Sequence, residues 1–129
     1  MTVADVNADR RPDLIIPSHN NDHVLVLQND GSYQFKVRSI AVGRHPIAVA
    51  ALDLTDDGLP ELAVLNAADN TLQVLINRGD SGFVGGAVNT IVTGAQPVAL
   101  AAGDLNNDGK SDLVVVHRES GLVKLLFAP

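Results

Sequence analysis

Apolar and polar residues alternate in short blocks along this chain. Runs of Val, Ile, Leu and Ala are separated by Gly, Asn, Asp and Pro. The apolar runs have the length of strands and lack the 3.6-residue period of an amphipathic helix. Short runs rich in Val and Ile between turn residues are typical of β-strands. The pattern therefore predicts an all-β protein.

The pattern repeats. An acidic nine-residue segment begins at Asp5, again at Asp53 and again at Asp104, so the copies are spaced by 48 and then 51 residues. The register extends beyond these segments, because Pro46 and Pro97 each lie seven residues before the next acidic segment. A period of about 20–50 residues indicates a solenoid or a propeller. The chain is therefore expected to consist of repeated units.

One period holds four short apolar runs, and four antiparallel strands per repeat form one blade of a β-propeller. The first run of each period is rich in alanine, which suits the crowded innermost strand. In the middle repeat we expect strands over residues 47–52, 62–66, 71–76 and 88–93. The predicted fold is about two and a half four-stranded antiparallel blades in one segment, residues 1–129. The predicted blades are about 1–43, about 44–94 and about 95–129, truncated at both ends.

This number of blades predicts an incomplete propeller. Closed propellers typically have about 4–8 blades. Repeats bury their apolar faces only against their neighbours. We therefore expect either the remaining blades of a longer chain or self-association of this one.

The acidic segments have the chemistry of calcium loops. Ca²⁺ takes roughly 6–8 oxygen ligands, and each segment has oxygen-bearing side chains at positions 1, 3, 5 and 9. The backbone carbonyl at position 7 completes the candidate set. The candidate ligands are Asp5, Asn7, Asp9, the Arg11 carbonyl and Asp13; Asp53, Thr55, Asp57, the Leu59 carbonyl and Glu61; and Asp104, Asn106, Asp108, the Lys110 carbonyl and Asp112.

The three loops differ in quality, and together they would hold up to three Ca²⁺. The third loop has every expected residue type and is the strongest candidate. The second has Thr55, a weaker ligand. The first has Arg10 where the other two have glycine, and a non-glycine residue in a left-handed conformation costs about 1–2 kcal/mol. Because clustered carboxylates repel one another, a bound cation is expected to order each loop.

Two other interpretations of these segments remain. An EF-hand would require a glutamate at position 12 and flanking helices, whereas position 12 is Ile16, Val64 and Val115. Alternatively, the segments are acidic turns that bind nothing tightly.

From Pro97 through Val115 the sequence resembles the FG-GAP/VCBS repeats, the calcium-loop β-propeller blades of integrin alpha chains and many bacterial secreted proteins. The resemblance covers essentially the whole chain, with Arg10 as its main departure. It implies Ca²⁺ at the loops and an extracellular or cell-surface setting. It does not fix a biochemical function. We expect a non-catalytic scaffold or a recognition surface for a protein or carbohydrate ligand.

Charge and composition narrow the possible functions. The formal net charge is −6, and ten of the fifteen acidic residues lie inside the three loops. Only nine Lys and Arg are present, without a basic stripe, which argues against nucleic-acid binding. The chain has no cysteine, no signal-peptide pattern at its start and no apolar run near the ~20 residues of a membrane span.

The remaining sequence features concern catalysis, adhesion and transition-metal binding. No catalytic constellation is evident, so we expect a protein that is not an enzyme; the alternative is an accessory propeller portion of a larger enzyme such as a polysaccharide lyase or hydrolase. Arg78-Gly79-Asp80 spells an integrin-ligand sequence, which would make the protein an adhesin, but it falls on a predicted hairpin turn. We expect His19, His23 and His117 to be turn residues rather than metal ligands.

Overall fold

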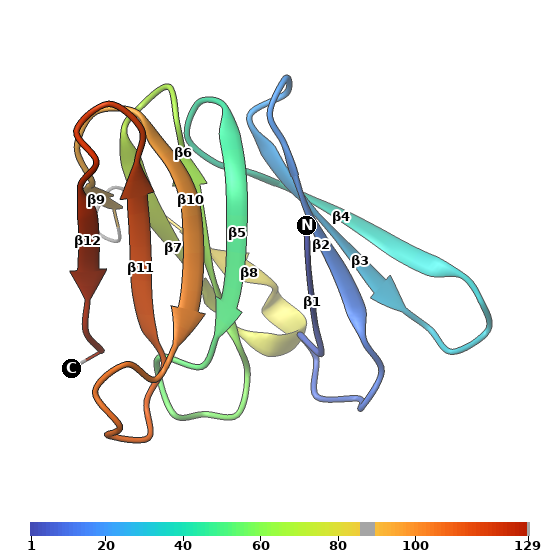
Figure 1. Cartoon of the computed structure of the whole chain (residues 1–129). Coiled ribbons are helices and arrows are strands. Elements are labelled where there is room, and N and C mark those ends of the chain that lie inside the picture. The colour runs from blue at the N-terminus through green and yellow to red at the C-terminus, as the bar shows by residue number, and fades with distance from the viewer. Residues whose placement is uncertain (86–89, 129) are drawn as a thin grey trace.

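The computed structural model describes residues 1–85 and 90–128. Its described residues form strands in three antiparallel sheets with one short 3₁₀ turn, η1 (Gly79–Ser81). The sheets lie side by side in chain order, like three blades (Figure 1). The predicted all-β class is therefore confirmed.

Each sheet is built from consecutive strands joined by turns. Sheet order follows chain order in all three blades, apart from β9, which pairs with β7. Blade 1 contains β1 (Thr2–Ala4), β2 (Asp13–Ser18), β3 (His23–Asn29) and β4 (Phe35–Ala41). Blade 2 contains β5 (Pro46–Leu52), β6 (Glu61–Asn66), β7 (Thr71–Asn77), β8 (Phe83–Val84) and β9 (Thr90–Val92). Blade 3 contains β10 (Pro97–Gly103), β11 (Asp112–His117) and β12 (Val123–Leu126).

The outermost part of blade 2 differs from the predicted single strand over 88–93. Two short strands pair with different parts of β7: β8 pairs with its end at Ile76 and Asn77, and β9 with its start at residues 71–73. The first part of the predicted strand lies outside the described residues. The other three predicted strands of this blade agree with β5, β6 and β7 to within a residue at each end.

Blade 2 is the core of the molecule because both of its faces are covered. Successive side chains of a strand point to opposite faces of the sheet. Val49, Leu62, Val64 and Leu75 pack against blade 1, while alternate residues such as Leu65 pack against blade 3. All six residues of β6 are buried as a result.

The first strand of each blade is the innermost one, as predicted. β5 contacts β1 on one side and β10 on the other, and Figure 1 shows these three strands in the middle of the array. Pro46 and Pro97 are both buried and begin β5 and β10. Small side chains let the inner strands of neighbouring blades approach one another.

An equivalent hydrogen bond joins each pair of consecutive blades on the side opposite the acidic loops. Asp22 in blade 1 accepts a hydrogen bond from the His45 amide, 2.8 Å from donor to acceptor. Asn70 in blade 2 accepts the corresponding bond from the Gln96 amide at 3.0 Å. All four residues have positive φ, between 52° and 56°. The same local geometry therefore fixes both blade-to-blade connections.

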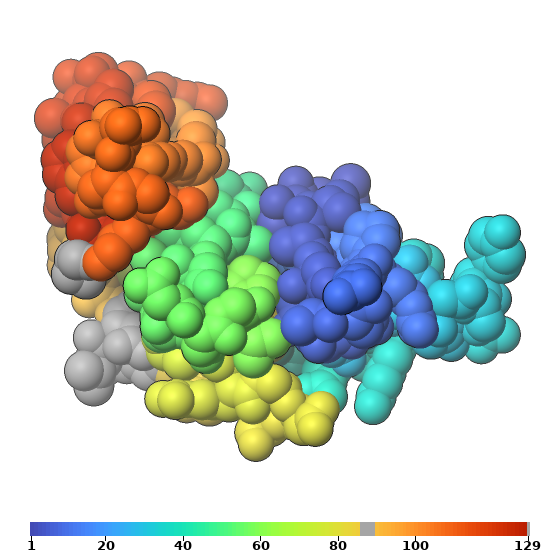
Figure 2. Space-filling model, turned by 90° about the horizontal axis from the view of Figure 1, so that it is seen from below, coloured from blue at the N-terminus to red at the C-terminus, as the bar shows by residue number. Residues whose placement is uncertain are grey.

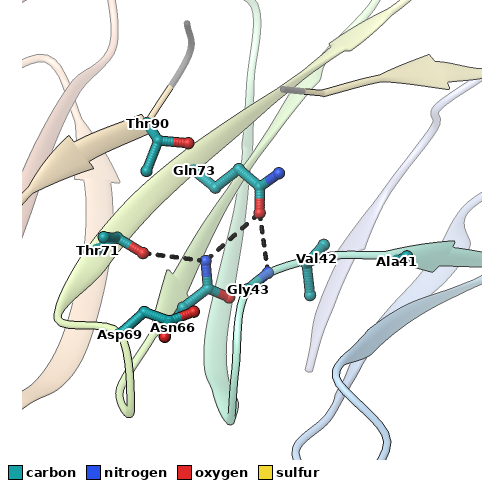
Figure 3. Close-up of a pocket in the computed structure, with 8 residues that line it drawn as sticks. All are labelled: Ala41, Val42, Gly43, Asn66, Asp69, Thr71, Gln73 and Thr90. Carbon is teal, nitrogen blue, oxygen red and sulfur yellow. Dashed lines mark hydrogen bonds between the residues drawn. The ribbon is translucent and has the colours of Figure 1, made fainter. Parts of the chain in front are cut away.

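An open pocket of about 370 Å³ lies where the first connection enters blade 2 (Figure 3). The Gln73 side-chain oxygen accepts hydrogen bonds from the Gly43 amide (3.1 Å) and the Asn66 side-chain amide (3.4 Å). Asn66 is fully buried. A Cβ atom on Gly43 would lie only 2.6 Å from the Asn66 Nδ2 atom. Close approach of a buried amide therefore requires glycine here.

Replacing Gly43 by alanine is expected to destabilise the protein by about 1–3 kcal/mol, the usual cost of overpacking. Gly103→Ala is the matched control, because a Cβ there meets nothing within 4 Å. Urea denaturation of both variants measures the difference. Equal stabilities would contradict the role assigned to the close contact.

Candidate metal centre

The three acidic loops connect the first and second strands of their blades and lie at the same edge of the molecule (Figure 1). Figure 2 looks onto this edge and shows one loop from each blade, in blue, green and orange. The three loops therefore lie on one face of the molecule.

The loops share one backbone conformation. The residue at position 4 has positive φ in each copy, with values of 58°, 57° and 61° for Ala8, Asp56 and Asn107. Position 6 is also left-handed, at 82° for Gly58 and 86° for Gly109. Short acidic sequences of the same pattern have therefore folded in the same way three times.

Arg10 occupies position 6 of the first loop and adopts the same left-handed conformation, at φ 67°. The Arg10 amide donates to the Asp5 carboxylate at 2.6 Å, as the Gly109 amide donates to Asp104 at 2.9 Å. The first loop thus keeps the common fold at the expected cost of about 1–2 kcal/mol for a non-glycine residue.

The carboxylates at positions 1 and 5 hold the loop backbone. In the third loop, Asp104 accepts from the amides of Asp108 (3.1 Å) and Gly109 (2.9 Å). Asp108 accepts in turn from the Lys110 amide at 2.9 Å, and that hydrogen bond is the main reason why the pKa of Asp108 is lowered. Its carboxylate therefore stays ionised at mildly acidic pH, which is the form that a cation needs.

Position 3 differs between the loops. The side-chain amide of Asn106 donates to Asp108 at 2.8 Å, and Asn7 makes the same contact with Asp9 at 3.0 Å. Thr55 has no amide group to make this contact. The second loop therefore differs from the others in its hydrogen bonds as well as in its composition.

The acidic residue at position 9 is fully buried in all three loops. Asp13 accepts the amide of Val6, at position 2 of its own loop, at 2.9 Å. Its other oxygen accepts the amide of Asn29, at the end of β3, at 2.8 Å. In blade 1, position 9 therefore anchors the loop to the third strand, a role that the sequence did not reveal. The matching bonds in blade 3 join Asp112 to the amides of Leu105 and Ala128.

The second loop departs from this arrangement. Glu61 accepts the Leu54 amide at 2.8 Å through one oxygen. Its other oxygen, Oε1, is buried and has no hydrogen-bond partner among the described residues, and the same is true of Asp53 Oδ1. Buried polar atoms normally have a partner. Two unsatisfied carboxylate oxygens in one acidic loop fit the donor set of a calcium ion.

Across the described part of the chain, no three His, Cys, Asp or Glu side chains converge into a metal cluster. Calcium also accepts amide and backbone carbonyl oxygens, which each loop supplies in addition to its carboxylates. The residues therefore fit calcium by oxygen chemistry, and the orphaned oxygens of Asp53 and Glu61 are the most direct sign of it.

Asn77, at the end of β7, ties two blades together at the loop edge. It is buried, and its side-chain amide donates both to the Pro60 carbonyl in the second loop (3.1 Å) and to the Val6 carbonyl in the first (2.8 Å). Asn29 is its counterpart in blade 1, and donates to the Pro12 carbonyl at 3.3 Å. Both lie sixteen residues after position 9, which is the sequence signal for this pair.

The remaining motifs are placed as follows. Arg78-Gly79-Asp80 forms the tight turn between β7 and β8, with Arg78 and Asp80 exposed, so the predicted turn is confirmed. His19 lies in the turn before β3, which His23 begins. The expectation of a turn is therefore wrong for His23, and it is also wrong for His117. His117 is the last residue of β11 and is 2% exposed, and its ring lies beside Gly94.

No helix among the described residues is long and apolar enough to cross a membrane.

No curated protein and no solved structure matches the chain. The FG-GAP-like repeat family matches residues 5–64 and again residues 53–115. Each match begins at the first aspartate of an acidic loop and ends within the second strand of the following blade. The three sheets are therefore β-propeller blades, and the chain belongs to the FG-GAP-like repeat family.

Proposed function

We propose that this protein is a non-catalytic calcium-binding propeller module that serves as a scaffold or recognition surface. FG-GAP repeats often bind Ca²⁺ and are typical of extracellular proteins. The observation that carries the proposal is the second loop, where two buried carboxylate oxygens lack a hydrogen-bond donor among the described residues. A secreted or cell-surface setting, where calcium is abundant, suits such a site.

Each loop would hold one ion through the side chains at positions 1, 3, 5 and 9 and the carbonyl at position 7. The ion would supply positive charge that neutralises the carboxylates. In the second loop, Asp53 and Glu61 would use the oxygens that no described residue satisfies. The sequence favours the third loop, where every ligand type is present. A comparison of these two loops is therefore the sharpest test.

The test is isothermal calcium titration of the chelator-treated protein beside two variants. Asp104→Ala/Asp108→Ala removes the third loop's exposed carboxylates, and Asp53→Ala/Asp57→Ala removes the matching pair from the second. We expect two or three sites in the parent and one site fewer in each variant. Absence of stoichiometric calcium binding by the folded parent would refute the proposal. A parent that binds calcium while either variant loses no site would refute the assignment of that loop.

FG-GAP blades assemble with other blades. We infer that further blades cover the two faces of this module that its own blades leave open. The surface left after assembly would then recognise a protein or carbohydrate ligand.

A further inference from the structure

The contact between two neighbouring blades is made by matched rows of apolar side chains. Cross-strand partners share a face of the sheet. In blade 2, the rows Ala48–Leu65–Leu72 and Ala50–Ala63–Val74 run across β5, β6 and β7. Their buried members pack against blade 3. These rows are the surface that blade 2 contributes to its junction with blade 3.

Blade 3 carries the same rows on the face turned away from blade 2. By strand register these rows are Ala99–Val116–Val123 and Ala101–Val114–Leu125. Val123 and Leu125 are 52% and 48% exposed, whereas Leu72, which corresponds to Val123, is fully buried. We call these six residues the blade-3 outer face. This face has the same rows that blade 2 uses to contact blade 3, but no part of the described chain covers it.

Blade 1 carries the other half of such a junction. Blade 2 packs on blade 1 through Val49–Val64 and Ala51–Leu62–Leu75. The corresponding rows of blade 1 lie on its face turned away from blade 2, where Val3 is 55% exposed. We call this surface the blade-1 outer face. Its rows are Val3–Leu14–Leu27 and Ile16–Leu25.

The acidic loops also contain matching contact groups that are used between blades 1 and 2 and left unused at the two outer faces. Between blades 1 and 2, the position-2 side chain of Val6 is 2% exposed, and its carbonyl accepts from Asn77. The position-2 residue of blade 3, Leu105, is 51% exposed. Asn29 has the same local contacts as Asn77 but lies in blade 1, whose outer face has no blade against it.

We propose that the blade-1 outer face of one copy of this chain binds the blade-3 outer face of a second copy, head to tail. The contact repeats the junction that the chain already makes between its own blades. The Asn29 amide would donate to the Leu105 carbonyl of the other copy, as Asn77 does to Val6. Such an interface joins two different surfaces, so it is heterologous and extends until it closes.

A second copy is a better occupant than an unrelated protein. All eleven residues of the two outer faces are Ala, Val, Leu or Ile, so a partner needs apolar rows at the spacing of a blade. The chain itself supplies both halves in matching register. Large exposed apolar patches on soluble proteins mark interaction sites, and these two patches complement each other.

The experiment is sedimentation velocity of the purified 129-residue chain, in calcium and in chelator. Val3→Glu places a charge on the blade-1 outer face, and Leu125→Glu places one on the blade-3 outer face. We expect the parent to sediment at twice its 13.5 kDa mass or more, and each variant to be monomeric. An equimolar mixture of the two variants keeps one intact junction, so it is expected to form a dimer.

Both mutated positions are about half exposed, so circular dichroism is expected to show unchanged folding. The matched control is Val84→Glu, 55% exposed on β8 of the middle blade, which is expected to assemble like the parent. A monomeric parent at 100 µM (about a hundred times a micromolar Kd) overturns the proposal and leaves the faces to blades of another chain. A mixture that stays monomeric, or a single variant that still assembles, rules out a head-to-tail junction.

Discussion

Asp13→Ala is expected to lower the free energy of unfolding by on the order of 3 kcal/mol, even in chelator. Its carboxylate is fully buried and accepts the amides of Val6 and Asn29 at 2.9 and 2.8 Å. Each buried donor left without an acceptor costs about 1–3 kcal/mol. Chemical denaturation with calcium removed isolates this effect from any loss of metal binding.

The control for this prediction is Asp9→Ala, in the same loop. Asp9 accepts the Arg11 amide at 2.9 Å and the Asn7 side-chain amide at 3.0 Å. Both donors are exposed, so water can replace the lost carboxylate, and surface substitutions usually change stability by less than about 0.5 kcal/mol. In chelator the Asp9 variant is therefore expected to resemble the parent. If both variants lose the same stability, position 9 is not an anchor.

Asn77→Ala is expected to cost about 2–4 kcal/mol and to loosen blade 1 from blade 2. The substitution removes hydrogen bonds to the Val6 and Pro60 carbonyls and leaves two acceptors unsatisfied in a region that is largely buried. Urea denaturation gives the overall loss. The Val6 amide donates a hydrogen bond to Asp13. Faster hydrogen exchange of this amide would report the local loosening.

Asn29→Ala is the control that separates the loss of stability within a blade from the loss between blades. Asn29 and Asn77 both contact the carbonyl at position 8 of their own loop and the glycine two residues later. The bond to a neighbouring blade belongs to Asn77. At a concentration where the chain is monomeric, a smaller loss for Asn29→Ala is therefore expected. Equal losses would show that Asn77 acts within its own blade.

The sequence predicted those features that depend on local residue order. The loops recur with the same oxygen positions, and the left-handed conformation at position 6 follows from the glycine that the second and third loops share. The small first strands predicted β5 and β10 as inner strands, because bulk does not fit there.

Features that depend on contacts between blades were not predictable in the same way. The spacing of Asn29 and Asn77 was visible, but which carbonyl each would contact depends on whether another blade lies alongside. His117 lies in a strand and beside Gly94, a residue more than twenty positions away, so nothing near it in the sequence indicates its burial. The anchoring bond of Asp13 reaches Asn29 across the sheet, beyond any local motif.

The ninth position shows why a ligand pattern and a structural pattern can coincide. The same carboxylate that suits calcium also accepts the amide of position 2 in blades 1 and 3. It also accepts the amide of Asn29 at the end of the third strand in blade 1, and of Ala128 just after the third strand in blade 3. Each oxygen has more than one lone pair, so the two roles are compatible. Metal titration alone would not separate them, whereas the stability measurements in chelator do.

The common placement of the three loops gives the molecule an electrical polarity. Ten of its fifteen acidic residues belong to loops at one edge, while the formal net charge is only −6. Within a Debye length of about 10 Å at 0.1 M salt, this edge presents a concentrated negative potential. A cationic surface or polymer will therefore meet the protein edge-on, loops first. Divalent ions bound there would weaken that orientation before they changed the shape of any blade.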